Sequence, residues 1–327
     1  MAERVLVTGV TGYIGQHCGA ELLRQGYEVY GTIRSMEKAE AVREGIAKVA
    51  PIDNLTFVAA DLMSDLNWQD VMSGCKYVLH VASPFIIGSP DDESEMISPA
   101  VDGTLRVLKA AKAANVERVV VTSSLVAIIA GKSSGHYGID SWSDPEAEIG
   151  TYAKSKVLAE KAAWSFAEEH DLDIAVINPG GVMGPSLTGQ VDGFSLTMIS
   201  DIITGKYPLV PDICVGFIDV RDVAKLHVAA MTADKAKGKR FIASSDEPLH
   251  FTEITGILKT AGYKKASTIQ APKFLLRIMS LFDDQVKGLL PMVGHRQTVD
   301  NQETYEILSW DPTSMEKSLI ETAESIS

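Results

Sequence analysis

The chain has 327 residues, 46% of them hydrophobic and 22% charged, as in a globular protein with one large domain or a main domain carrying a smaller one. The formal net charge is −13, which excludes nucleic acid and an anionic membrane as expected partners, because an acidic surface attracts neither. Cys18, Cys75 and Cys214 stand far apart, so neither disulfides nor a zinc site is expected.

Neither a secretion signal nor a membrane span is expected. The first three residues lead directly into a strand-like run, without a basic start and a long apolar stretch. No run of about 18 apolar residues occurs anywhere in the sequence. We therefore expect a cytoplasmic protein.

Up to Pro179, short apolar runs rich in Val and Ile alternate with amphipathic segments. The runs predict strands at Val5–Thr8, Glu28–Ile33, Thr56–Ala60, Tyr77–Val81, Val119–Thr122 and Ile174–Asn178. The segments between them predict helices at Gly12–Gln25, Glu37–Val49, Trp68–Met72, Ser94–Ala114 and Tyr152–His170. This alternation predicts βαβ units and a doubly wound parallel sheet, the Rossmann-type α/β fold.

Beyond Pro179 the regular alternation of predicted strands and helices ends. Residues 180–193 are rich in glycine, which indicates a loop. Further elements are expected as a helix at Phe194–Thr204, a strand at Phe217–Val220, a helix from Asp222, a strand at Arg240–Ala243 and mostly helices after Phe251. We expect a dinucleotide-binding domain of residues 1–182, with 214–247 returning to it. Residues 183–213 and 248–327 are expected to form a smaller, mostly helical substrate lobe.

The glycine-rich segment Thr8–Gly15 follows the first predicted strand and opens the first predicted helix. Glycines allow a tight turn that brings the backbone close to a pyrophosphate, and the helix start offers unpaired N–H groups and a positive dipole. The residues expected to bind a dinucleotide here are Gly9, Thr11, Gly12, Tyr13, Ile14 and Gly15.

Arg34 follows the second predicted strand, about 20 positions after the glycines, where NAD-binding units place a carboxylate on the ribose 2′-hydroxyl. A guanidinium, with Lys38 one helical turn further on, suits a 2′-phosphate instead, so NADP(H) is favoured. The ends of the next two strands should also face the cofactor. We expect Asp61 and Leu62 beside the adenine, and Val81, Ala82 and Ser83 beside the nicotinamide ribose.

Tyr152 and Lys156 form a YxxxK motif on a predicted helix, where a spacing of four residues puts both on one face. Ser123 and Ser124 stand at the end of the preceding strand. A free tyrosine has a pKa of about 10, so acid–base chemistry near neutral pH needs an adjacent cation to lower the Tyr152 pKa. Lys156 is the expected cation.

Taken together, the glycine loop, the Thr122–Ser124 strand end and the YxxxK motif resemble the extended short-chain dehydrogenase/reductase family. Within it the chain is similar to the dihydroflavonol reductase-like branch, which includes plant dihydroflavonol and cinnamoyl-CoA reductases and fungal carbonyl reductases. The resemblance is carried by Thr32–Arg34, His80–Phe85, Val101–Thr104, Asn178–Gly180 and Asp219–Ala224, and more loosely by Leu308–Trp310.

The resemblance implies the catalytic set Ser124, Tyr152 and Lys156. Ser124 would hydrogen-bond the substrate carbonyl, with Ser123 as the alternative, and Tyr152 would transfer the proton. Lys156 would bind the nicotinamide ribose. Tyr152 and Lys156 then also contact the cofactor, and Pro179 and Val182 lie beside it.

Phe85, Leu125 and Ile129 are expected to wall the substrate pocket together with Ser124. Plant dihydroflavonol reductases carry Asn five residues after the active serine, where this chain has Ile129, so an apolar aldehyde or ketone is favoured over a flavonoid. No basic cluster is visible for the anionic tail of a CoA thioester. No metal is expected, because the histidines lack ligand spacing. Family members occur as monomers and as homodimers.

The leading hypothesis is an NADPH-dependent reductase that converts a small aldehyde or ketone to an alcohol. An NAD-dependent nucleotide-sugar epimerase or dehydratase has the same fold and Ser/Tyr/Lys set, but Arg34 replaces the acid that NAD needs. The third hypothesis is a non-catalytic NADP(H)-sensing regulator. Such proteins commonly lose the Tyr or the Lys, and this chain has both.

Overall fold

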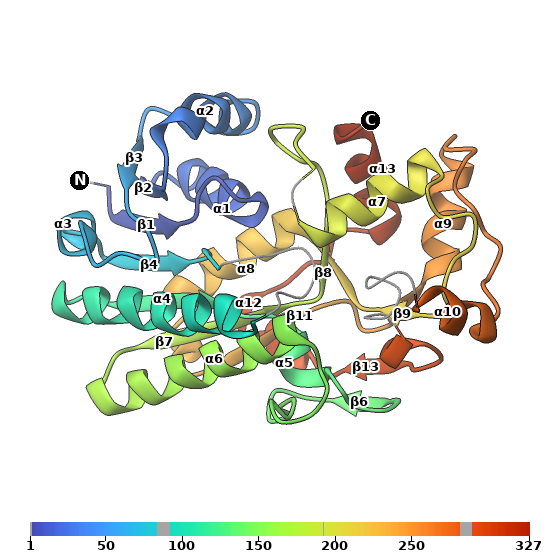
Figure 1. Cartoon of the computed structure of the whole chain (residues 1–327). Helices are drawn as coiled ribbons and strands as arrows, with labels where there is room; N and C mark the ends of the chain where they lie inside the picture. The colour runs from blue at the N-terminus through green and yellow to red at the C-terminus, as the bar shows by residue number, and fades with distance from the viewer. Residues whose placement is uncertain (1, 84–91, 192, 282–289) are drawn as a thin grey trace.

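The computed structural model describes residues 2–83, 92–191, 193–281 and 290–327. Its centre is a seven-stranded, all-parallel sheet in the order β11-β7-β5-β4-β1-β2-β3 (Figure 1). The strands are β1 (Arg4–Thr8), β2 (Glu28–Ile33), β3 (Leu55–Ala59), β4 (Tyr77–His80), β5 (Arg118–Thr122), β7 (Ile174–Pro179) and β11 (Arg240–Ala243). Because side chains alternate along a strand, Val5 and Val7 pack on one face and Leu6 on the other.

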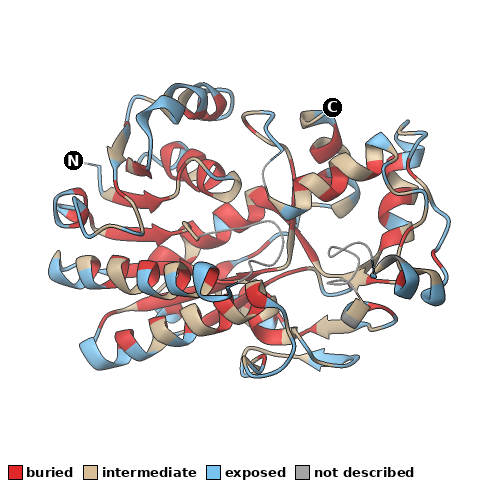
Figure 2. Ribbon diagram, in the orientation of Figure 1, coloured by how far each residue is buried: buried red, intermediate tan, exposed pale blue. Residues whose placement is uncertain are grey.

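Helices cover both faces of this sheet. One face packs against α1 (Tyr13–Arg24), α2 (Ala39–Ala47), α8 (Val220–Thr232) and α12 (Gln302–Leu308). The other packs against α3 (Trp68–Met72), α4 (Ser94–Ala113) and α6 (Thr151–His170). Burial on both faces explains why the strands read as continuous apolar runs, and Figure 2 shows them buried between helices whose outer sides are exposed.

The remaining elements are short or belong to the C-terminal part. The helices among them are α5 (Val126–Ile129), α7 (Phe194–Thr204), α9 (Phe251–Thr260), α10 (Lys273–Met279) and α13 (Met315–Ser325), with 3₁₀ turns at Met36–Lys38, Asp234–Ala236 and Leu290–Met292. Three two-stranded pairs join β8 (Gly181–Met183) to β10 (Phe217–Asp219), β9 (Cys214–Val215) to β12 (Leu249–His250), and β6 (Gly135–Tyr137) to β13 (Gln297–Val299).

A third apolar cluster lies outside the sheet and joins β8, α7, α9 and α13, through residues such as Met183, Ile199, Ile254 and Leu319. The cluster contains residues of both segments predicted for the substrate lobe, together with Phe217 of β10. The segment 302–310, predicted as part of that lobe, packs against α8 and β11 of the sheet layer.

The prediction of a doubly wound parallel sheet is confirmed. The ends of its seven strands lie within one residue of the predicted positions. The predicted strand at Phe217–Val220 pairs with β8 rather than joining the main sheet. The sequence did not predict α5 or the short strands, because two to four residues carry no readable periodicity. Within the described ranges, no helix is both long and apolar enough to cross a membrane.

Candidate active site

The strand order reverses between β1 and β4, and in such sheets ligands bind where the carboxyl ends of these strands separate. The loops after the two strands touch each other. The Ala82 N–H donates to the Thr8 hydroxyl at 3.0 Å, and a Cβ on Gly9 would lie 2.9 Å from the Ala82 Cα. Gly9 also has a φ of +66°, so two constraints require glycine there. The structure thus brings the predicted residues of both strand ends together.

The glycine loop has the geometry of an anion cradle. The Gly12 N–H donates to the Gly9 carbonyl at 2.9 Å, and a Cβ on Gly15 would lie 2.2 Å from that oxygen. Helix α1 then begins at Tyr13, with no side-chain cap and no acid in its first turn. The first-turn N–H groups and the positive end of the helix dipole therefore have no anionic side chain of this helix to satisfy them, which fits a bound pyrophosphate.

The side chains of Tyr13 and Ile14 have other partners. The Tyr13 hydroxyl donates to the Gly184 carbonyl at 2.6 Å, and burial raises the Tyr13 pKa well above its ordinary value. Ile14 packs against the apolar layer between α1 and α8. These two residues can therefore serve a dinucleotide through their backbone N–H groups. The Thr11 carbonyl is held by the Gln16 amide at 2.9 Å.

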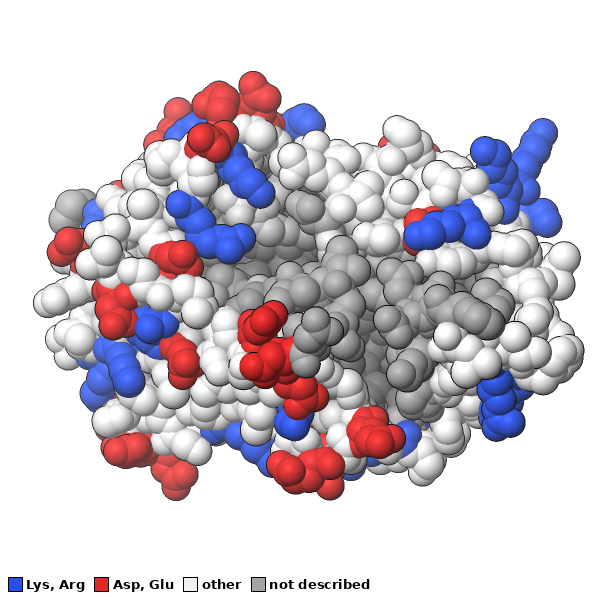
Figure 3. Space-filling model, in the orientation of Figure 1, with Lys and Arg blue, Asp and Glu red and all other residues white. Residues whose placement is uncertain are grey.

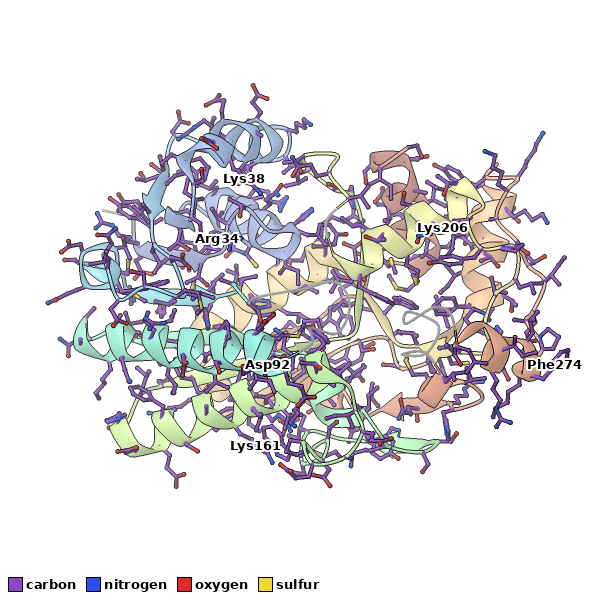
Figure 4. All side chains as sticks on the ribbon, in the orientation of Figure 1. Arg34, Lys38, Asp92, Lys161, Lys206 and Phe274 are labelled. Atoms are coloured by element: carbon purple, nitrogen blue, oxygen red, sulfur yellow. The ribbon has the colours of Figure 1, made fainter. Side chains whose placement is uncertain are left out.

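Arg34 and Lys38 lie at the open end of the crevice. Arg34 follows the last residue of β2, and Lys38 ends the 3₁₀ turn that leads into α2 (Figure 4). Both side chains are exposed, and neither forms an ion pair with an acid of the described ranges. Two cations without a carboxylate partner, beside a pyrophosphate cradle, match the requirement of a 2′-phosphate.

Asp61 and Leu62 follow β3, and Leu62 is held in place by contacts with α4. The Asp61 carboxylate accepts the Met63 N–H at 3.0 Å, which makes a local turn. Leu62 packs against Gly103 of α4, where a Cβ would lie 3.0 Å from the leucine Cβ. The Arg106 guanidinium donates to the Leu62 carbonyl. The predicted adenine side of the crevice is thus fixed by α4.

Ser124, Tyr152 and Lys156 converge at the carboxyl end of β5. The Ser124 and Tyr152 hydroxyls are hydrogen-bonded to each other. The Lys156 ammonium lies 5.9 Å from the centroid of the Tyr152 ring, and its side chain is buried. This happens because α6 starts directly at Thr151, so that the first two turns of the helix carry both YxxxK residues toward the end of β5.

The acid–base balance of this group differs from our expectation. Burial raises the pKa of Tyr152 above its ordinary value, and the hydrogen bond from Ser124 only partly offsets that rise. Burial also lowers the pKa of Lys156 to about 8. The expected depression of the Tyr152 pKa is therefore not seen in the protein alone, where burial is the largest influence on this group. Tyr152 is accordingly protonated at neutral pH, which is the form that a general acid needs.

The two serines have different partners. The Ser123 hydroxyl donates to the buried carboxylate of Glu160 at 2.5 Å. The Ser124 hydroxyl faces Tyr152 and also accepts the Val126 N–H at 3.4 Å. Only Ser124 therefore meets the tyrosine hydroxyl, which favours it over Ser123 for contact with a substrate.

The predicted pocket residues have mixed surroundings. Leu125 is buried in a cluster with Ile128, Ile242 and Val299, against which Ile129 also packs. Pro179 ends β7, where its carbonyl accepts the Leu125 N–H at 2.8 Å, and Val182 is buried in β8. Phe85 lies outside the described residues.

Two histidines that received no role from the sequence are buried at the strand ends. His80 accepts the Thr8 hydroxyl at Nδ1, 2.9 Å away, since its Nε2–H points to Thr104. His227 of α8 donates from Nδ1 to a backbone carbonyl, so its Nε2 accepts the Thr122 hydroxyl at 2.7 Å. Burial lowers the pKa of His80 to about 3 and that of His227 to about 4, so both are neutral. No spacing in the sequence could reveal these contacts.

The described part of the chain contains no cluster of three or more His, Cys, Asp or Glu residues able to hold a metal ion. A doubly wound sheet with a glycine cradle at its switch point and a Ser–Tyr–Lys group beside it defines the class of short-chain dehydrogenases and reductases. Comparison with models of protein families identifies the family within this class. The model of the NAD dependent epimerase/dehydratase family matches residues 5–243, and the chain belongs to this family. The resemblance to the extended short-chain dehydrogenases/reductases is thereby confirmed.

Curated relatives and solved structures agree with this assignment. The chain is 32% identical to cinnamoyl-CoA reductase CAD2 of Medicago truncatula over 98% of this chain and 95% of that protein. It is 33% identical to an anthocyanidin reductase of Vitis vinifera over 71% and 74%. Yeast methylglyoxal/isovaleraldehyde reductase Gre2, solved with NADPH, superposes with a TM-score of 0.81 at 27% identity, covering 99% of this chain and 98% of that one.

Proposed function

We propose that the protein is an NADPH-dependent reductase that converts a small, uncharged aldehyde or ketone to an alcohol. The observation that carries this proposal is the hydrogen-bonded Ser124–Tyr152 pair with the Lys156 ammonium beside it, at the crevice where a dinucleotide binds. The same two hydroxyls can both reach one carbonyl oxygen.

NADP(H) is the cofactor that the residues fit. The glycine loop and the start of α1 would hold its pyrophosphate, and Arg34 and Lys38 its 2′-phosphate. Gre2 from yeast and Gre2 from Candida albicans were both solved with NADPH, and the latter is 28% identical with a TM-score of 0.80. Arg34, in place of an acid, argues against the NAD-dependent epimerase alternative.

The reduction would require three actions of the chain. When bound, the reduced nicotinamide supplies the hydride. Ser124 donates a hydrogen bond to the carbonyl oxygen and so polarises it, and Tyr152 donates its proton to the same oxygen. Lys156 stabilises the tyrosinate that remains, and would hold the ribose hydroxyls. Tyr152 is protonated before reaction, as reduction requires, and the Lys156 charge would offset the cost that burial adds to forming the tyrosinate.

The charges near the site favour an uncharged substrate. Asp92 and Glu93 stand at the start of α4, where Figure 3 shows acidic side chains gathered, while Arg34 and Lys38 lie at the other side of the crevice. Glu93 also accepts the Lys154 ammonium at 2.9 Å, which links this acidic end to the first turn of α6. An anionic CoA thioester would meet carboxylates there, whereas an apolar carbonyl compound would not. Ile129 offers no hydrogen bond to a flavonoid hydroxyl.

The test is NADPH oxidation with a panel of aliphatic and aromatic aldehydes, ketones, one dihydroflavonol and one CoA thioester, repeated with NADH. Turnover of uncharged carbonyl compounds with a preference for NADPH is the expected result. Preference for the CoA thioester or the dihydroflavonol would overturn the substrate class. No turnover at all, with tightly held NAD in the purified protein, would point to the epimerase chemistry. NADPH binding without turnover of any compound would indicate a regulator.

A further inference from the structure

Glu160 is a carboxylate buried in the middle of α6, one helical turn after Lys156, with an exposed fraction of 1%. Burying a charge is costly unless it is well paired, so a carboxylate in this position needs donors. It has four, from four parts of the fold. They are the Ser123 hydroxyl at 2.5 Å, the Asn178 amide at 2.8 Å, the Trp164 indole at 3.2 Å and the Arg240 guanidinium, whose Nη2 donates to Oε2 at 3.4 Å. The Arg240 guanidinium also forms an ion pair with Glu160, with Nε 2.6 Å from Oε1.

These contacts reach the active serine from two sides. Ser123, which Glu160 holds, is the direct neighbour of Ser124. The Asn178 amide, which donates to Glu160, also donates to the Ser124 carbonyl at 3.2 Å. The peptide of Ser124 is therefore tied to one carboxylate through β5 and through β7. Because the Ser124 hydroxyl meets Tyr152, a shift of this peptide would separate the reacting pair.

The Glu160 charge also acts on Lys156. Both residues line one small cavity with Ser123, His80 and Thr104, and Glu160 is the only carboxylate among its described lining residues. Burial lowers the Lys156 pKa to about 8, and the Glu160 charge opposes this change. Of the other titratable groups here, Tyr152 and His80 are neutral, and Arg240 lies on β11, where its guanidinium also donates to the Ile139 and Ser141 carbonyls.

We propose that Glu160, with Arg240 as its counterion, is a positioning residue of the reaction: it fixes the Ser123–Ser124 segment from beneath and supplies the negative charge that keeps Lys156 an ammonium. This proposal rests on the proposed function, since it assumes that Ser124 and Lys156 act on a substrate and its cofactor. Tyr152 contacts only the hydroxyl of Ser124, whereas Glu160 holds the backbone of the Ser123–Ser124 segment through the Ser123 hydroxyl and the Asn178 amide.

The experiment compares Glu160→Gln and Glu160→Asp with the wild type, using NADPH and the best carbonyl substrate found for the wild type. We expect Glu160→Gln to lower kcat about tenfold or more, because an amide cannot accept from all four donors. The alkaline limb of its kcat–pH profile should move to lower pH by about one unit, because Lys156 loses its counter-charge. Glu160→Asp keeps the charge, so its alkaline limb should stay near that of the wild type.

Asp173→Asn is the matched control. Asp173 pairs with Arg118 at 2.9 Å and is largely buried, but this ion pair joins the opposite ends of the same two strands, β5 and β7. The Asp173→Asn substitution should lower the melting temperature and leave kcat and the pH profile of kcat unchanged. A loss of kcat in Glu160→Gln by one constant factor at every pH would reduce the residue to a structural role and overturn the proposal. A wild-type kcat and profile would do the same.

If Glu160→Gln does not fold, Ser123→Ala tests the positioning role of Glu160 instead. It removes one hydrogen bond and keeps the charge, so kcat should fall about threefold or more with no shift in pH. An unchanged kcat would contradict the positioning role. If the wild type reduces no carbonyl compound, the proposed function fails, and the charge is then tested by NADPH fluorescence titration. As the pH rises, NADPH binding to Glu160→Gln should begin to weaken at a lower pH than NADPH binding to the wild type. Identical binding curves would overturn the proposed role of the Glu160 charge.

Discussion

The two ends of the cofactor crevice are built in opposite ways. At the catalytic end, Lys156 is buried and Ser124 and Tyr152 are linked to each other and, through Ser123, to a buried carboxylate. At the phosphate end, Arg34 and Lys38 project into solvent and hold no acid of the described ranges. One end is fixed before any ligand arrives. The other consists of two exposed cations that follow the end of β2.

The contrast follows from the work that each end has to do. Proton transfer needs reacting atoms held within a few tenths of an ångström, and burial provides this at the cost of shifted pKa values. Recognition of a phosphate needs only positive charge and donors within reach, since the ligand brings its own charge. We therefore expect substitutions at the catalytic end to change the rate, and substitutions at the phosphate end to change the choice of cofactor.

The largest effect is expected for Tyr152→Phe. Loss of the general acid should lower kcat by about 100-fold to 10 000-fold, because the protonated hydroxyl has no substitute. NADPH binding, measured by fluorescence titration, should change little, since the phenylalanine preserves the ring beside Lys156. Near-normal turnover of this variant would show that Tyr152 is not the general acid. It would also contradict the expectation that substitutions at the buried end change the rate.

Ser124→Ala comes next, with Ser123→Ala as its partner. Removing the hydroxyl that polarises the carbonyl should lower kcat by about 100-fold. Ser123→Ala should cost much less, because Ser123 contacts Glu160 rather than Tyr152. Steady-state kinetics on both variants would check this order. If Ser123→Ala were the more damaging change, the assignment of the two serines would have to be exchanged.

Arg34→Ala tests the exposed end. The dissociation constant for NADPH should rise about tenfold to 100-fold, because a charge-assisted contact to the 2′-phosphate is lost, while binding of NADH should hardly change. Lys38→Ala should act in the same direction with a smaller effect, since a flexible ammonium is a weaker match for a phosphate. Equal losses for NADPH and NADH would show that Arg34 does not read the phosphate.

The smallest effect is expected in stability against pH. His227 has its pKa lowered from 6.5 to about 4 by burial, so the unfolded chain binds its proton first as the pH falls. Stability is therefore fully present above about pH 6.5 and is lost toward pH 4, by about 2 kcal/mol at about pH 5 for this residue. Urea unfolding over this range would measure it. His227→Gln keeps an acceptor for Thr122 and should flatten this part of the curve, and an unchanged curve would mean that His227 is not buried and neutral.

Much of the fold could be predicted because its signals are local. Val5–Val7 in β1 and Val119–Val121 in β5 are unbroken apolar runs, and the loop at Gly9–Gly15 needs glycine for reasons that a few neighbouring residues impose. The YxxxK motif was equally readable, because helical geometry fixes which face Tyr152 and Lys156 share. Short elements such as α5 and β8 carried no such signal, since their conformation depends on what packs against them.

The sequence by itself thus determined the sheet, the glycine cradle and the choice of the side chains proposed as catalytic, all of which depend on contacts between near neighbours or on strict spacing. Only the tertiary structure decided the partners of the two serines, the burial that raises the Tyr152 pKa, and the meeting of Glu160 with Arg240, which stands 80 residues away along the chain. Such contacts arise where separate strands and helices meet. No local pattern records them, because their energy comes from desolvation and pairing after the chain has folded.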